Sequence, residues 1–214
     1  MANFLKKRSV SIPLVINAGV SSLILALGMT PTFGAFTASI SAGMNNASSG
    51  MIVMQETNSA GTITCLSTDG GGLLLDAASC SSINKFGGET GMRPGDGAVV
   101  VTNIKNVGTV AASSFALTAG PCVQSAAGPA SGSATDFCSK FAVSITSGSS
   151  SIFSGTAATL GSAGGIDVLA RLGLPKVQVG LQIPITVTTT MDASVGNSYQ
   201  GLTVSQPMTW TFTA

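Results

Sequence analysis

Four cysteines are the residues of this chain best suited to covalent chemistry: Cys65, Cys80, Cys122 and Cys138. In an exported chain an even number of cysteines predicts disulfides, because export leads into an oxidising compartment. Four cysteines allow three pairings. The local pairing, Cys65 with Cys80 and Cys122 with Cys138, closes two loops of similar length, and each bond would stabilise the fold by about 3 kcal/mol. A metal site is the competing interpretation, but the chain lacks histidine and its cysteines do not have C-x-x-C spacing.

The absence of histidine restricts the enzymatic chemistry open to the chain. It excludes a Ser-His-Asp triad, a Cys-His dyad and the H-E-x-x-H zinc motif. A serine–lysine pair is open by composition, but Ser139-Lys140 is better interpreted as an exposed helical turn. Asp167, Asp192 and Asn197 do not have the D-x-D-x-D-G spacing of a calcium loop. We therefore predict no catalytic residue, no metal ligand and no cofactor.

The amino-terminal region has the organisation of an export signal. The basic cluster Lys6-Lys7-Arg8 precedes a mostly apolar run over residues 10–29, and small residues follow. This order of basic, apolar and small-residue regions is typical of a signal peptide, which we expect to be a helix. The apolar run is about 20 residues long, close to the length of a membrane span, so an uncleaved signal that anchors the protein is the alternative.

The small residues after the apolar run predict where the signal is cut. Cleavage between Gly34 and Ala35 places Thr32 at the −3 position, whereas a cut one residue later would place the bulky Phe33 there. We therefore expect residues 1–34 to be removed. The precursor would lie transiently in the membrane, and the product would be secreted, either extracellular or at the cell surface.

Composition limits the partners of the processed chain. Cleavage would leave 180 residues, which suit one domain with a real core. They include six basic and eight acidic residues, a net charge of −2, without a basic patch, so nucleic acid and anionic membrane surfaces are not expected as partners. Charged residues make up only 8% of the chain, against about 25% in an average globular domain, and few charges are left to oppose association at strand edges.

A short alternating segment follows the expected cleavage site. Phe36, Ala38 and Ile40 alternate with polar residues over residues 36–41, which predicts a strand with one apolar side. A polar linker separates it from the next apolar run. The expected organisation is therefore a signal peptide, an amino-terminal strand with its linker, and a β-rich domain, at residues 1–34, 35–49 and 50–214.

The β-rich domain is predicted to be an all-β, jelly-roll-like antiparallel β-sandwich with one or two short helices in its loops. Alternation is clearest near the carboxyl end, where Trp210 falls on the apolar phase and is expected in the core. The glycine- and serine-rich segments 120–134 and 155–165 are expected to be loops, and short helices are expected at 136–140 and 166–172. The expected strands cover residues 51–57, 61–66, 98–104, 113–118, 141–146, 183–191 and 202–212.

Several short motifs follow one another along the chain. They are Ala35-Phe36-Thr37 after the signal, then Gly50-Met51-Ile52-Val53-Met54, Met92-Arg93-Pro94-Gly95-Asp96, Asn106-Val107-Gly108, Asp136-Phe137 with Phe141 and Val143, and finally Asn197, Gln200 and Gly201. In this order they resemble the TasA/camelysin family of exported filament and biofilm-matrix proteins, which use a SipW-type signal peptidase. The chain departs from the family pattern in two respects: it has no acidic residues directly after the A-F start, and its cysteine loops are additional.

The resemblance implies a function as well as a fold. It implies a jelly-roll sandwich and, as in filament-forming members, an amino-terminal donor strand that completes the sheet of the next subunit, with Phe36, Ala38 and Ile40 in apolar pockets. The protein would then be a secreted structural subunit of an extracellular fibre or biofilm matrix. Its partners would be copies of itself, a minor accessory subunit and, during export, the signal peptidase.

Three alternatives accompany this expectation. Residues 36–41 could fold onto their own domain as an ordinary edge strand. The protein could be a monomeric surface-binding module held by an uncleaved signal. Some relatives are described as metallopeptidases, but without histidine no residue here supports transfer of that activity.

Overall fold

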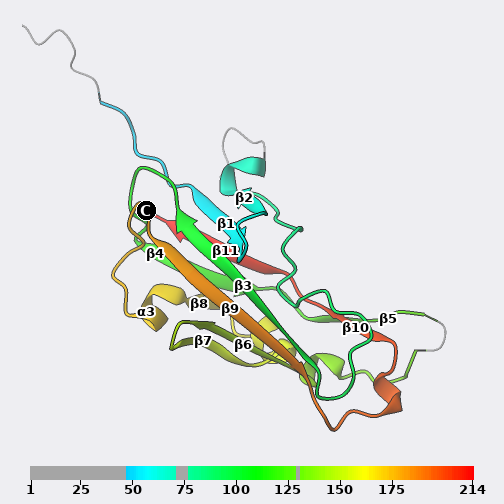
Figure 1. Ribbon diagram of the computed structural model, residues 1–214. Helices are drawn as coiled ribbons and strands as arrows, with labels where there is room; N and C mark the ends of the chain where they lie inside the picture. The colour runs from blue at the N-terminus through cyan, green and yellow to red at the C-terminus, as the bar shows by residue number, and fades with distance from the viewer. Residues whose placement is uncertain (1–46, 71–76, 129–130) are drawn as a thin grey trace, which may run out of the picture. The chain divides into compact units, whose positions relative to one another are not determined.

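The computed structural model describes residues 47–70, 77–128 and 131–214. These residues form antiparallel sheets with short helices in the connections, as Figure 1 shows. The strands are β1 (Met54–Asn58), β2 (Thr64–Leu66), β3 (Gly97–Asn106), β4 (Ser114–Ala119), β5 (Val123–Ala126), β6 (Phe141–Ser147), β7 (Ser150–Thr156), β8 (Gly165–Asp167), β9 (Gln182–Met191), β10 (Leu202–Ser205) and β11 (Met208–Thr213). The helical segments are η1 (Ser67–Gly70), η2 (Phe137–Ser139), α2 (Ala157–Gly161), α3 (Val168–Leu172) and η3 (Asn197–Tyr199).

The first layer is a six-stranded sheet in the order β2-β1-β3-β9-β6-β7, with every neighbouring pair antiparallel. The long strands β3 and β9 form its centre, and their register places Ile104 opposite Ile183 and Thr102 opposite Ile185. Both strands alternate buried residues with more exposed ones, because successive side chains of a strand point to opposite faces. One face of this sheet is therefore a continuous core face.

The second layer is a ribbon in which β4 and β5 run antiparallel to β11 and β10. β4 pairs with β11 and with β8, and β5 pairs with β10. The ribbon is irregular between the two pairs. There the N–H of Gly120 donates to the carbonyl of Pro207, and the side-chain amide of Gln206 donates to the carbonyls of Gly120 and Ala157. Successive strands often change layer, as in a jelly-roll-like sandwich.

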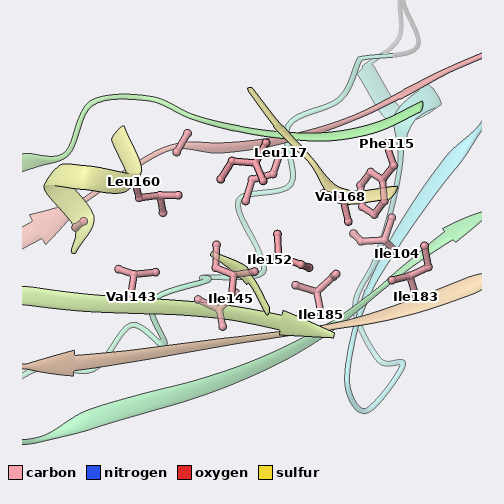
Figure 2. Packing of buried hydrophobic residues seen from close by; sticks show 14 of the residues in the cluster. Ile104, Phe115, Leu117, Val143, Ile145, Ile152, Leu160, Val168, Ile183 and Ile185 are labelled. Atoms are coloured by element: carbon pink, nitrogen blue, oxygen red, sulfur yellow. The ribbon is translucent and has the colours of Figure 1, made fainter. Parts of the chain in front are cut away.

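The hydrophobic core lies between the two layers. Figure 2 shows Phe115 and Leu117 of β4 on one side, and Ile104, Ile145 and Ile185 of the six-stranded sheet on the other. None of these five side chains has exposed surface. Burying one such side chain stabilises the fold by about 1.5–3 kcal/mol. The core therefore fixes the positions of both layers and of the strand edges that they present.

Asn106 closes the turn after β3 from inside the protein. Its fully buried side chain donates to the carbonyls of Val110 and Val177, and its Oδ1 accepts from the N–H of Gly108. A Cβ at Gly108 would collide with the carbonyl oxygen of Met51, so glycine is the residue that fits there. Packing and hydrogen bonding thus explain the Asn-x-Gly sequence at this turn.

The all-β class, the antiparallel sandwich and the short helices in its loops are confirmed. The strands expected at 183–191 and 202–212 are present, but they belong to different layers, and the second is divided into β10 and β11. Proline explains the division, because Pro207 cannot donate to a strand ladder.

Three strands of the structure, β5, β7 and β8, were not predicted from the sequence. β5 lies in the segment 120–134, which was expected to be a loop. β8 covers the start of the segment 166–172, which was expected to be a helix. β7 falls where the sequence predicts no element. The expected loop at 155–165 contains α2. These strands are short or rich in serine and glycine. β5 and β8 pair with strands far away in the sequence, β10 and β4, whereas β7 pairs with the preceding strand β6, so pairing rather than local alternation determines all three.

The helix expected at 166–172 is present over a shorter range, as α3. α3 begins at Val168, and the side chain of Asp167 accepts from the N–H of Ala170, which caps the first turn. Gly173 ends the helix with a φ of 66°, a left-handed conformation that favours glycine.

Candidate functional site

β11 forms a free edge of the second layer. It pairs with β4 on one side and, among the described residues, has no partner strand on the other. The apolar side chains of the neighbouring strand β4, such as Phe115 and Leu117, have no exposed surface. Along the edge itself the apolar side chains are only half-buried, because they are covered from one side; they are Leu202, Val204, Met208, Trp210 and Phe212.

A groove with a volume of about 1380 Å³ lies against these half-buried side chains. We call it the edge groove. Residues of β1, of the segment before β3 and of β6 line it together with β10 and β11. The apolar lining residues outside β10 and β11 include Ile52, Met54, Ile83, Phe86, Met92 and Phe141. The edge groove therefore combines an unpaired strand edge with an apolar lining.

Residues 81–94, which we call the strap, form one wall of the edge groove. The strap contains no strand or helix, and its backbone closes a local turn from Gly87 to Asn84. Side chains attach it to the sandwich: Ile83 is buried, and the ring of Phe86 lies 5.3 Å from that of Phe141. Packing rather than a strand ladder therefore holds this wall in place.

An ion pair joins the strap to the six-stranded sheet inside the edge groove. Lys85 Nζ lies 2.6 Å from Glu56 Oε1 of β1 and also donates to the carbonyl of Ile83. Only 12% of the Lys85 side chain and 10% of the Glu56 side chain are exposed. The two charges therefore neutralise each other in a largely dry part of the groove lining.

The four cysteines form the two local disulfides, Cys65–Cys80 and Cys122–Cys138. The first joins β2 to the chain that leads into the strap, and the second joins the residue before β5 to η2. Each sulfur atom is bonded to that of its partner cysteine, so none of the four is available to a metal ion. Two disulfides indicate that the protein folds in an oxidising compartment.

Ser82 and Lys85 have the S-x-x-K spacing of some serine–lysine pairs. The structure separates their contacts. The Ser82 hydroxyl lies 3.8 Å from the sulfur of Cys65 and 3.7 Å from that of Cys80, whereas Lys85 pairs with Glu56. The two residues therefore have different partners.

Asp136 and Tyr199 form a second polar contact at the edge groove. Asp136 precedes η2 but does not cap it; instead its Oδ1 accepts from the Tyr199 hydroxyl at 2.6 Å. This hydrogen bond, aided by desolvation, raises the pKa of Tyr199 above its usual value of 10.0. The Tyr199 ring lies 5.8 Å from that of Phe137 and lines the groove.

The other acidic residues considered for metal binding have structural partners. Asp167 caps α3, and Asp192 accepts from the N–H of Ser194 at 2.8 Å, which lowers the pKa of Asp192 below its usual value of 3.8. Lys140 lies 3.5 Å from Asp192, so Ser139-Lys140 is part of a surface turn. In the part of the chain that the structure describes, no group of three or more His, Cys, Asp or Glu is placed to hold a metal ion.

The predicted cleavage site and amino-terminal strand fall outside the described residues; they are Gly34, Ala35, Phe36, Ala38 and Ile40. The sequence pattern identifies the apolar phase of β10 and β11 but not its exposure. Pro207 is the signal that could have revealed the free edge, because proline inside a strand pattern indicates an edge or a bulge.

Neither a membrane-spanning helix among the described residues nor a known relative helps to assign the site. Within residues 47–70, 77–128 and 131–214, no helix has both the length and the apolar character needed to cross a bilayer. Neither a protein-family model nor a curated protein matches the sequence.

Proposed function

We propose that this protein is an exported structural subunit whose copies join by strand addition. Residues 36–41 of one copy lie along the free edge of β11 in the next copy, and Phe36, Ala38 and Ile40 enter the edge groove. Main-chain hydrogen bonds to β11 give the contact its length, and the apolar side chains give it specificity. The product is an extracellular fibre or surface matrix.

The half-burial of the apolar side chains along β10 and β11 carries this proposal. A strand edge that is not meant to pair is normally protected by charges, prolines or a covering segment. β11 has the sequence MTWTFT and holds no charged residue, while its apolar phase faces the edge groove. An added strand would cover Met208, Trp210 and Phe212 in the way that the strands on both sides of β4 cover its apolar side chains.

The size and the lining of the edge groove suit a chain segment. Small-molecule sites usually have volumes of roughly 300–1,000 Å³, and this groove has about 1380 Å³. Residues 36–41 offer apolar side chains on one side and polar ones on the other. A strand with that alternation turns its apolar side into the groove and its polar side to water.

The disulfides and the composition agree with an extracellular assembly. Two disulfides indicate an oxidising compartment, which is where an exported protein folds. Charged residues form only 8% of the chain, so little repulsion opposes association of many copies. The ordered motifs that resemble the TasA/camelysin family support the same function.

The linker decides between a closed monomer and an open chain of subunits. Residues 42–50 span up to about 30 Å when extended, so the amino-terminal strand can leave its own domain. A contact between the strand of one copy and the groove of the next is head-to-tail, and such a contact builds a filament when it does not close into a ring. A strand that returned to its own groove would give a monomer instead.

Deletion of residues 35–42 from the processed protein tests the proposal. The intact protein is expected to form fibres in electron micrographs and rapidly sedimenting species. The deletion variant is expected to sediment as a monomer with an unchanged circular-dichroism spectrum. Fibres that persist in the variant, or an intact protein that stays monomeric at high concentration, would contradict the proposal.

A further inference from the structure

The strap is attached to the sandwich in a way that permits movement. Its backbone hydrogen bonds are local, and it is anchored by the side chains of Ile83, Lys85 and Phe86. Segments without a strand or helix ladder open at a lower free energy than the strands of a core. The wall that the strap forms is therefore the part of the edge groove best able to adjust to an incoming strand.

The Glu56–Lys85 ion pair is the polar attachment of this wall. Both side chains line the edge groove, and both are about nine-tenths buried. A buried ion pair often contributes no more stability than an apolar pair of similar volume, because desolvation offsets the attraction. Stability alone therefore does not explain the pair, whereas a positioning role does: it fixes the strap against β1 at one defined place.

Resting on the proposed function, we infer that the strap clamps the docked strand and that Glu56 and Lys85 position the clamp. A strand added along β11 fills the edge groove and removes the remaining water from the ion pair. Attraction between two charges rises as the local dielectric falls, and separating a desolvated pair is costly. An occupied groove thus holds the strap closed.

The effect is reciprocal, because coupling between two equilibria acts in both directions. If the docked strand stabilises the closed strap, the closed strap must equally retain the docked strand. The ion pair then acts chiefly on the rate at which the strand leaves. Glu56 and Lys85 are positioning residues in this scheme, since they hold a wall of the groove.

Hydrogen exchange and peptide release test the inference. The protein is the chain lacking residues 1–42, and the probe is a synthetic peptide of residues 35–42. Peptide binding is expected to slow amide exchange in residues 81–94. In Lys85→Gln the peptide is expected to dissociate about tenfold faster with a nearly unchanged association rate, because loss of one partner of a buried charge pair acts mainly on dissociation.

Two further variants separate positioning from folding. The double variant Glu56→Leu/Lys85→Met keeps apolar packing in place of the charges, so it is expected to fold, to release the peptide faster and to show less protection of the strap. Lys140→Gln is the matched control. This substitution breaks the ion pair between Lys140 and Asp192, whose side chains are 35% and 39% exposed, respectively. Neither residue lines the edge groove, so the rate of peptide release is expected to be unchanged.

The possible results distinguish this inference from the proposed function. If the peptide binds, but strap exchange does not change and Lys85→Gln releases it at the wild-type rate, the clamp is wrong and strand addition stands. A lower melting temperature of Lys85→Gln with wild-type release would likewise reduce the ion pair to a structural role. If the peptide does not bind at all, both proposals fall.

Discussion

Phe115 of β4 and Phe212 of β11 are paired directly across the two strands, with ring centroids 4.9 Å apart, yet only Phe115 is fully buried. On the far side of β4 the second layer continues with β8, whereas among the described residues no strand follows β11. Trp210 shows the same asymmetry: its ring lies 5.6 Å from that of Phe115, but the residue is half-buried and lines the edge groove. The expectation that Trp210 is a core residue is therefore right for one face of its side chain only.

Trp210 should report directly on occupation of the edge groove. It is the only tryptophan of the chain, and an added strand would cover its remaining exposed surface. We expect a peptide of residues 35–42 to shift the fluorescence emission of the chain lacking residues 1–42 to shorter wavelength, in a saturable manner. The matched control peptide carries Phe36→Asp and Ile40→Asp and is expected to leave the emission unchanged. An equal shift with both peptides would show that binding does not use the apolar phase.

Lysine on the groove side of the edge should prevent docking. In Val204→Lys/Met208→Lys two half-buried apolar side chains become charged, and a docked strand would have to desolvate those charges. We expect the peptide affinity to fall by at least about tenfold, since tenfold corresponds to only 1.4 kcal/mol. The control Thr118→Lys/Ser125→Lys adds the same charge at exposed positions of the neighbouring strands β4 and β5, which do not line the edge groove. Equal losses in the two variants would indicate a charge effect without a groove.

The Cys122–Cys138 disulfide should contribute measurably to stability. It closes a loop with a sequence separation of 16 and ties β5, one of the strands of the second layer, to η2. We expect Cys122→Ala/Cys138→Ala to lower the free energy of unfolding by about 3 kcal/mol in denaturant titrations. A loss below about 1 kcal/mol would mean that the second layer constrains this loop without the bond.

Asn106 should be among the most sensitive positions outside the apolar core. Asn106→Ala leaves the carbonyls of Val110 and Val177 and the N–H of Gly108 without their side-chain partner inside the protein. We expect a loss of about 3 kcal/mol in the free energy of unfolding, because each unsatisfied buried group costs about 1–3 kcal/mol. Asn103→Ala, on the outer face of the same strand, is the control and should stay within about 0.5 kcal/mol.

Tyr199 gives a pH-dependent test of the contact with Asp136. It is the only tyrosine, so an ultraviolet titration follows it alone. The hydrogen bond to Asp136 raises its pKa above 10.0 in the folded protein. The contribution of this bond to stability is therefore fully present below the unfolded pKa and is lost as the pH rises through the higher folded pKa. Asp136→Asn should move the midpoint back toward the usual value, and a midpoint unchanged by that substitution would contradict the assignment.

Local patterns predict the regular parts of this fold and miss the parts that depend on distant partners. The alternation at 183–191 suffices to identify β9, because one face of that strand is buried along its whole length. β8 has three residues and exists because Ile166 lies opposite Leu117 of β4. No sequence pattern of this length distinguishes such a strand from a loop.

The candidate site shows the same limit. The apolar phase of residues 202–212 is visible in the sequence. Its half-burial reflects that β11 has no second neighbouring strand among residues 47–70, 77–128 and 131–214, which is a property of the folded layer. The Glu56–Lys85 contact joins β1 to a segment without regular structure, so no periodicity predicts it. The local disulfides were one of three pairings that the sequence allowed, because cysteine count and spacing do not fix the connectivity.

A mixing experiment tests strand addition most directly. One chain lacks residues 35–42 and can only accept a strand; the other keeps them but carries Val204→Lys/Met208→Lys and can only donate one. Each is expected to sediment as a monomer alone, and an equimolar mixture is expected to give a one-to-one dimer in analytical ultracentrifugation. Two chains that remain monomeric when mixed, or a donor chain that assembles with itself, would contradict the central claim.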